Sequence, residues 1–254
     1  MDIWGNYQTI SEARGETKRD AAFKREIHFL QSHSKDSLSH TTAVVDGYEQ
    51  EVTVINSDNL NEKSIISQPG ENLRNGALVE WMDNYWLITE RDANTTIYTK
   101  CKMIQCNYLL KWVSKDGLIH KQWCIIEDGT KYLTGEFEDR NFVVTRGDSR
   151  IAMTIAKNEL TDKFEREYRF LIDDPDSPHK LAYALTKPLK LGGVFNGDGC
   201  YKFVLQEVTA TEDDNHELGI ADYYKYYPKE VNTEDEQHPT VTEEQTTKGK
   251  KVWL

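Results

Sequence analysis

Apolar and polar residues alternate along residues 75–150, and short turns of Asp, Asn and Gly interrupt the alternation. A period of two residues is typical of half-buried β-strands. We interpret this segment as a contiguous antiparallel β-meander. It holds four of the six tryptophans, and we predict these to be core residues, since strand-borne indoles usually pack inside: Trp81, Trp86, Trp112 and Trp123.

Two tight turns predict β-hairpins. Asp46-Gly47 lies between two β-prone runs in residues 41–56, and Asp83-Asn84 lies in residues 77–90. Residues 96–114 fit one long strand or a bulged pair of strands. Further strands are expected at 149–156, 167–173, 181–186 and 199–210, and residues 218–227 end the fold as a strand or short helix. The predicted fold class is mainly β, an antiparallel β-barrel or sandwich-like meander.

In residues 17–33 the apolar residues recur with the period of an α-helix. Thr17 can cap it, and Phe23, Ile27 and Leu30 fall on one apolar stripe. Basic residues cover the remaining surface: Lys18, Arg19, Lys24 and Arg25. Two interpretations stay open, a helix lying on the β-domain with solvated charges, or a basic face turned towards an acidic partner or a DNA channel.

Both ends of the chain have the character of extended arms. Residues 1–16 mix Ile3, Trp4 and Tyr7 with polar residues, which suggests docking onto the parent domain or a neighbouring subunit. Residues 229–247 nearly lack apolar side chains, and an apolar tip follows a basic linker: Val252, Trp253 and Leu254. Such a tail either frays or becomes ordered on a partner.

These patterns divide the chain into four parts. We expect an N-terminal arm at 1–16, the amphipathic helix and a linker at 17–40, a β-rich domain at 41–228, and an acidic flexible tail at 229–254. A break near 157–180 would divide the β-rich domain into two subdomains.

Charge and cysteine content narrow the class of protein. The net charge of -12 argues against a generic nucleic-acid binder, which needs a basic face, although an acidic surface would let DNA slide past. Without a signal peptide, we expect a reducing cytoplasm and free thiols at Cys101, Cys106, Cys124 and Cys200. No apolar run reaches the length of a membrane span, so no membrane partner is expected.

The sequence offers little support for an enzyme, and we expect none, with no cofactor and no catalytic or metal-binding residues. Its seven histidines show no paired spacing, and no Gly-x-Ser-x-Gly elbow or phosphate-binding glycine loop occurs. Residues 146–148 spell Arg-Gly-Asp, which we interpret as a turn. The acidic run at 211–215 lacks the glycine and spacing of a calcium loop and predicts a solvated turn.

Several longer segments carry a family resemblance: GALVEWMDNYWLITERDANTTIYTKCKMIQCNYLLKW, EDRNFVVTRGDSRIAM, YRFLIDDPDSP, LTKPLKLG and TATEDDNHELGIADYY. With them, most of the chain resembles the head-closure (head-completion, head-to-tail connector) proteins of tailed bacteriophages of Gram-positive bacteria. The resemblance implies a virion structural protein of the neck, which forms a ring between portal and tail, closes the DNA-filled head and docks the tail.

The resemblance also implies partners. These are copies of the same chain, in a ring of twelve in preference to six, a portal or adaptor protein, a tail or tail-terminator protein, and passing DNA bound without sequence specificity. The protein would assemble in the host cytoplasm and reside at the head-tail junction of the virion. The terminal arms would then supply the candidate interface residues: Ile3, Trp4, Tyr7, Val252, Trp253 and Leu254.

One alternative comes from another class. A tail- or baseplate-associated module would recognise a host surface glycan through exposed tryptophans.

Overall fold

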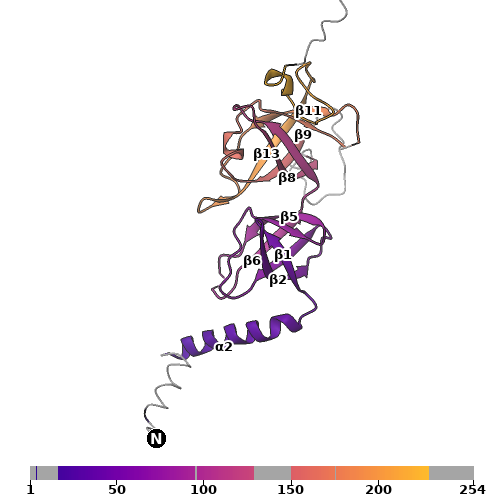
Figure 1. Ribbon diagram of the computed structural model, residues 1–254. Helices are drawn as coiled ribbons and strands as arrows, with labels where there is room; N and C mark the ends of the chain where they lie inside the picture. The colour runs from indigo at the N-terminus through magenta and orange to yellow at the C-terminus, as the bar shows by residue number, and fades with distance from the viewer. Residues whose placement is uncertain (1–3, 5–16, 95, 129–149, 175, 229–254) are drawn as a thin grey trace, which may run out of the picture.

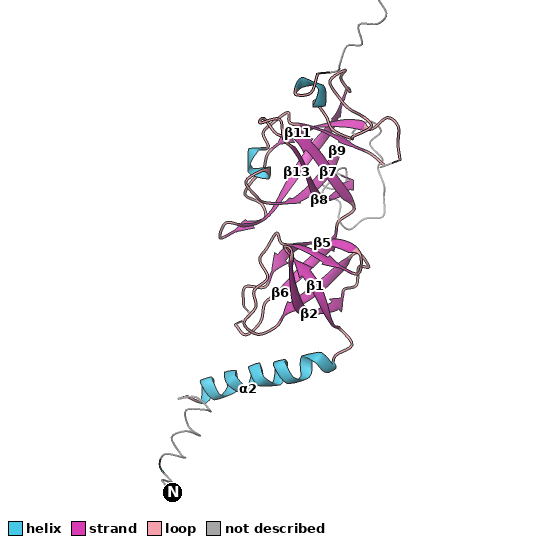
Figure 2. Cartoon of the chain, viewed as in Figure 1, coloured by secondary structure: helices cyan, strands magenta, loops and turns pink. Residues whose placement is uncertain are grey.

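The computed structural model describes residues 4, 17–94, 96–128, 150–174 and 176–228. Figure 1 and Figure 2 show helix α2 (Lys18–His33) followed by two antiparallel β-structures. The first contains β1 (His40–Val45), β2 (Tyr48–Asn56), β3 (Glu62–Ser67), β4 (Leu78–Trp81), β5 (Asn84–Arg91) and β6 (Lys100–Gln105). The second contains β7 (Tyr108–Val113), β8 (Ile119–Asp128), β9 (Arg150–Ala156), β10 (Arg169–Ile172), β11 (Leu181–Lys187), β12 (Val194–Phe195) and β13 (Asp198–Val208). The predicted mainly β fold is confirmed.

Strands β1 to β6 form a closed barrel in the order β1-β2-β3-β6-β5-β4. Its interior holds the alternate residues of each strand, such as Val52 and Val54 of β2 and Trp86 and Ile88 of β5. Because the barrel closes on itself, it leaves no strand edge open to another chain.

Both predicted hairpins are present in the barrel. Val45 pairs with Tyr48, so Asp46 and Gly47 form the first turn, with positive φ at both residues. The second turn was predicted wrongly by one residue. It lies at Met82-Asp83, because Asn84 belongs to β5, where it pairs with Trp81 and its side-chain amide donates to the Met82 carbonyl over 2.7 Å.

The second sheet has the order β10-β11-β13-β9-β8-β7, with β12 paired to β13. Its edge strands come close enough for tyrosines to bridge them. The Tyr108 hydroxyl donates to the Leu171 carbonyl over 3.1 Å, and the Tyr168 hydroxyl donates to the Val113 carbonyl. The sheet therefore curves round an aromatic core centred on Phe164, whose ring lies 5.2 Å from Trp112 and 5.1 Å from Phe170.

A single continuous meander over residues 75–150 was a wrong expectation. Strands β4 to β6 belong to the barrel and β7 to β9 to the second sheet, so residues 96–114 hold two strands in different sheets. The change occurs at Cys106-Asn107. The Cys106 amide donates to Tyr85 of the barrel, whereas the Asn107 side chain pairs with both backbone groups of Ile126 in β8.

This crossover is the division between the two sheets. A break had been placed near 157–180, but those residues contain the turn η2 (Thr161–Lys163) and β10, which both lie within the second structure. The predicted strands at 149–156, 167–173, 181–186 and 199–210 correspond to β9, β10, β11 and β13. Residues 218–227 contain a short helix, η3 (Tyr223–Lys225). The Arg-Gly-Asp triplet at 146–148 lies outside the described residues.

An apolar cluster joins the barrel to the second sheet. Leu87 is on the outer face of β5 and yet has no exposed surface, because Ile125, Ala156 and Cys200 of the second sheet cover it. The rings of Tyr85 and Trp123 stack across the same junction with their centroids 4.5 Å apart.

Glycines let the two backbones meet at this junction. A Cβ atom on Gly76 of the barrel would lie 2.2 Å from the carbonyl oxygen of Gly199, and one on Gly199 would lie 2.0 Å from that of Gly193. Gly199 also has a φ of +152°, which side chains rarely adopt. No larger residue fits the contact as it stands.

Helix α2 begins with a capping box. The Thr17 side chain accepts from the Asp20 amide over 3.1 Å, and the Asp20 carboxylate accepts from the Thr17 amide over 3.2 Å. The predicted cap at Thr17 is therefore confirmed. No residue of α2 is buried, so the interpretation that the helix lies on the β-domain is wrong. In Figure 1 α2 stands apart from the barrel and joins it through the turn η1 (Ser34–Asp36).

The four cysteines are free and buried, as expected. Burial raises the pKa of Cys101, Cys106 and Cys200 to about 12. The pKa of Cys124 is raised as well, for the same reason. No helix in the described part of the chain is long and apolar enough to cross a membrane.

The close glycine contact predicts that Gly199→Ala strongly reduces the stability of the fold. The new methyl group meets the backbone of Gly193 and Val194, so the free energy of unfolding should fall by about 3 kcal/mol and the melting temperature by roughly 10 °C. Gly70→Ala is the matched control, because Gly70 also has positive φ but no atom lies within 4 Å of the added Cβ. Equal losses in thermal unfolding of the two variants would show that backbone strain, and not close packing, limits residue 199.

The thiols should resist modification in the folded protein. At mildly alkaline pH the buried cysteines remain protonated and covered, so a colourimetric thiol reagent should react with none of them rapidly. After unfolding in guanidinium it should react with all four. A thiol that reacts at once in the native protein would contradict the packing of the core around it.

Candidate assembly surfaces and the Arg169 anchor

The structure places one of the six terminal interface candidates. Trp4 is 76% exposed. The other five lie outside the described residues: Ile3, Tyr7, Val252, Trp253 and Leu254.

The four strand tryptophans divide among three apolar clusters. Trp86 is 4% exposed inside the barrel and Trp112 is 2% exposed in the core of the second sheet. Trp81 is half-buried against Trp86 and donates its indole N–H to the Thr41 hydroxyl over 3.3 Å. Trp123 is half-buried at the junction between the sheets. The structure brings Trp81 and Trp86 together and separates the others.

A second face of α2 combines two of the basic residues named in the sequence analysis with Ala22 and Phe29, which that analysis did not single out. Lys18, Ala22, Arg25 and Phe29 recur at intervals of four, three and four residues, which places them on one side of a helix. All four are exposed, and Phe29 keeps 52% of its surface in contact with solvent. Its ring stacks on His33 with centroids 4.4 Å apart. We call these four residues the α2 outer face.

The α2 outer face had a signal in the sequence, the helical spacing of residues 18, 22, 25 and 29. The apolar stripe of Phe23, Ile27 and Leu30 obscured it, because that stripe alone satisfies the expected amphipathic pattern. In the structure those three stripe residues are half-buried, so the most exposed aromatic residue of the helix is Phe29.

Acidic side chains gather where two strands of the second sheet end. Strands β10 and β13 both run antiparallel to β11, and both end opposite the first residues of β11. The segments that follow Ile172 and Val208 therefore leave the sheet at the same end of its strands. Glu207 pairs with Tyr183 across β13 and β11, and Asp173 directly follows β10 on the other side of β11. Burial, together with the charges of these two carboxylates, raises the pKa of Tyr183. We call the following carboxylates the acidic end: Asp173, Asp174, Asp176, Glu207, Glu212, Asp213 and Glu217.

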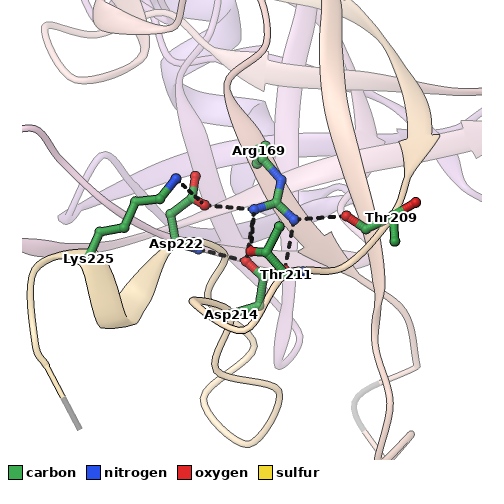
Figure 3. A network of polar contacts seen from close by, with 6 residues as sticks. All are labelled: Arg169, Thr209, Thr211, Asp214, Asp222 and Lys225. Carbon is green, nitrogen blue, oxygen red and sulfur yellow. Dashed lines mark hydrogen bonds and ion pairs between the residues drawn. The ribbon is translucent and has the colours of Figure 1, made fainter.

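Beside the acidic end, Arg169 of β10 holds the segment that follows β13 (Figure 3). Its two terminal nitrogens donate to the two carboxylate oxygens of Asp214 over 3.1 and 2.7 Å. One of them also donates to Asp222 over 2.6 Å, and the other donates to the Thr209 carbonyl over 3.2 Å. Lys225 completes the network with an ion pair to Asp222 at 2.8 Å. The arginine therefore ties residues 209–225 to the sheet.

Asp214 is the buried centre of this network, and its side chain has no exposed surface. Burial alone would raise the pKa of Asp214. The backbone amides of Thr211 and Asp222 and the guanidinium of Arg169 outweigh that effect, so the pKa lies below its ordinary value of 3.8. The carboxylate is thus ionised and paired at neutral pH.

Residues 211–215 form a turn, as predicted, but the expectation that it is solvated throughout was wrong. Asp214 and Asn215 are buried, because Arg169, 45 residues earlier in the chain, supplies the opposite charge. No local sequence signal marks that pairing. Among the described residues, no group of three or more His, Cys, Asp and Glu side chains lies in position to hold a metal ion.

Comparisons with known proteins give little for this chain. No protein-family model matches it, and no curated protein matches it. A solved structure of MrkH, titled "a novel c-di-GMP dependence transcription regulatory factor", is similar over 77% of this chain and 87% of that chain, with 8% identity and a TM-score of 0.22. So weak a similarity carries no argument about fold or function.

The buried pair predicts how stability depends on pH. Asp214→Asn leaves Arg169 without its main counter-charge, so at neutral pH the free energy of unfolding should fall by about 3 kcal/mol. Because the folded pKa of Asp214 is depressed, its contribution is complete above 3.8 and is lost as the pH falls through the lower folded value. The difference between wild type and variant in urea unfolding should therefore shrink at about pH 3.

Glu212→Gln is the control, since Glu212 is exposed and lies two residues from Asp214. It should change stability little at any pH. A difference between wild type and Asp214→Asn that stays constant from neutral pH to about pH 3 would mean that the ionised carboxylate is not what stabilises this segment.

Proposed function

We propose that this protein is a structural component of the virion neck in a tailed bacteriophage. In this proposal it forms a ring between portal and tail, closes the DNA-filled head and docks the tail. The proposal starts from the resemblance of residues 76–112, 138–153, 168–178, 185–192 and 209–224 to head-closure proteins. The fold and surface of the described residues support it in the three ways that follow.

The observation that carries the proposal is helix α2, which has 16 residues and buries none of them. A helix of that length gains most of its stability from packing its apolar side chains, and alone in water it is marginal. Phe23, Ile27 and Leu30 give α2 an apolar stripe, and Phe29 adds an exposed ring on another side. A helix of this kind fits a protein that completes its packing in an assembly.

The β-structures suit a building block in a ring. The closed barrel has no open strand edge, and Tyr108 of β7 and Tyr168, directly before β10, bridge the edges of the second sheet. Subunits of this shape associate through side chains and terminal arms, and uncontrolled strand addition is blocked. We propose a ring of twelve copies, with a portal or adaptor protein on one side and a tail or tail-terminator protein on the other.

The charge of the chain suits a channel for DNA. With a net charge of -12, the subunit repels the phosphate backbone overall, so DNA can pass without being held. The proposed location is the head-tail junction of the virion, reached by assembly in the host cytoplasm.

The glycan-binding alternative gains no support from the strand tryptophans. A sugar-binding platform needs aromatic rings that are exposed together on one face. Trp86 and Trp112 are buried, while Trp81 and Trp123 are half-buried in different clusters.

Native mass spectrometry and light scattering test the proposal. Purified protein, alone or mixed with the portal of its own phage, should give a discrete ring or a stable complex with the portal. Replacing Val252, Trp253 and Leu254 with serine should abolish that complex, since the apolar tip is a proposed anchor. The matched control replaces Gln245, Thr246 and Thr247 with serine and should leave it intact.

A monomer at all concentrations that also does not bind the portal would contradict the proposal. A portal complex that survives loss of the apolar tip unchanged would contradict only the role of the tip as an anchor, and the ring would stand.

A further inference from the structure

The α2 outer face has the composition of a contact surface. Phe29 is 52% exposed, and Lys18 and Arg25 lie on the same side of the helix, seven residues apart. Seven residues correspond to about 10 Å along a helix. Arg25 lies four residues and Lys18 eleven residues before Phe29, so a partner must offer an apolar spot for the ring and carboxylates on its N-terminal side. An exposed aromatic ring one turn from an arginine fits an interface core, since such cores are enriched in aromatic residues and arginine.

A second copy of this chain meets that description. The chain carries a net charge of -12, whereas α2 has four Lys and Arg residues against Asp20 and Glu26. Copies of so acidic a protein repel one another unless a local pair of opposite surfaces brings them together. The basic helix supplies one surface of such a pair.

The acidic end supplies the other surface. The same segments carry two exposed leucines, Leu181 at 43% and Leu218 at 41%. Leu181 pairs with Ile172, directly before Asp173, and Leu218 follows Glu217.

Two lysines share this surface: Lys111 donates to the Leu218 carbonyl over 3.3 Å, and the Lys180 side chain lies beside Gly219. The seven carboxylates exceed these two cations, so the exposed leucines and the excess negative charge complement Phe29 and the two cations that precede it on α2.

The two surfaces lie at opposite ends of the molecule. In Figure 1, α2 is at the end near the N-terminus, and η3, which the Arg169 network holds beside the acidic end, is at the other. One subunit can therefore use both surfaces at once, each with a different neighbour. Such a heterologous contact closes into a ring when the rotation between copies allows it.

We propose that the α2 outer face of one copy docks on the acidic end of the next copy. This contact rests on the proposed function, because it is the subunit contact of the proposed ring. It specifies which residues meet: Lys18, Arg25 and Phe29 on one side, and Glu212, Glu217 and Leu218 on the other.

A charge exchange tests the contact directly. The helix variant carries Lys18→Glu and Arg25→Glu, and the acidic-end variant carries Glu212→Lys and Glu217→Lys. Glutamate is favourable in the first turn of a helix, so Lys18→Glu should not weaken α2. Circular dichroism checks that both variants fold.

Each variant alone should self-associate at least about tenfold more weakly than wild type in light scattering at low salt, because like charges then face each other. An equimolar mixture should regain association. In the mixture the acidic helix of one variant meets the lysines of the other, and the unchanged helix meets the unchanged acidic end. Native mass spectrometry should show alternating assemblies with an even number of subunits.

A matched control separates the contact from total charge. Lys121→Glu and Lys202→Glu make the same change in net charge at exposed positions of β8 and β13, and should leave association as in wild type. Phe29→Ala changes no charge and should weaken association.

The outcomes distinguish this inference from the proposed function. If the helix variant forms the same ring or portal complex as wild type, or if the mixture does not regain association, the contact is wrong and the neck function stands. If wild type stays a monomer and also ignores its portal, both fail.

Discussion

The rest of the structure depends on the apolar junction between the barrel and the second sheet. Leu87 points away from the interior of the barrel and would be a solvent-exposed leucine in a barrel alone. It is fully buried because Ile125 and Cys200 of the second sheet lie against it. Burying such a side chain stabilises the folded state by about 2 kcal/mol, and the stacked rings of Tyr85 and Trp123 enlarge the same contact.

The close approach of the two backbones constrains the junction as much as the burial of apolar side chains does. The backbones of Gly76, Gly199 and Gly193 approach so closely that a single methyl group would force them apart. The Asn107 side chain, hydrogen-bonded to both backbone groups of Ile126 in β8, then directs the chain into β7 beside that strand. Apolar contact brings the two sheets together, and these backbone contacts fix how they meet.

Acidic and basic side chains are distributed unevenly over the molecule. Arg169 uses its guanidinium to neutralise Asp214 and Asp222, whereas the carboxylates of the acidic end are exposed or half-buried. The basic residues of α2 lie at the opposite end of the molecule (Figure 1). An acidic protein with one basic extension can thus repel DNA over most of its surface and still attract a copy of itself, as the proposed neck ring requires.

The sequence by itself determined the class of the fold, because local rules decide it. A period of two residues indicated strands, Asp46-Gly47 placed a hairpin, and Thr17 marked the start of α2. The position of Phe29 could also have been predicted from helical spacing alone, since residues 18, 22, 25 and 29 share one side of a helix.

Only the tertiary structure decided which strands share a sheet and which charges are paired. The alternation through residues 100–113 is the same whether the strands continue one sheet or cross to another, and the Cys106 and Asn107 hydrogen bonds made that choice. Asp214 looked like part of a solvated acidic turn until Arg169, 45 residues away, came beside it. Hydrogen-bond and ion-pair partners of this kind are remote along the chain, so the pattern of neighbouring residues does not reveal them.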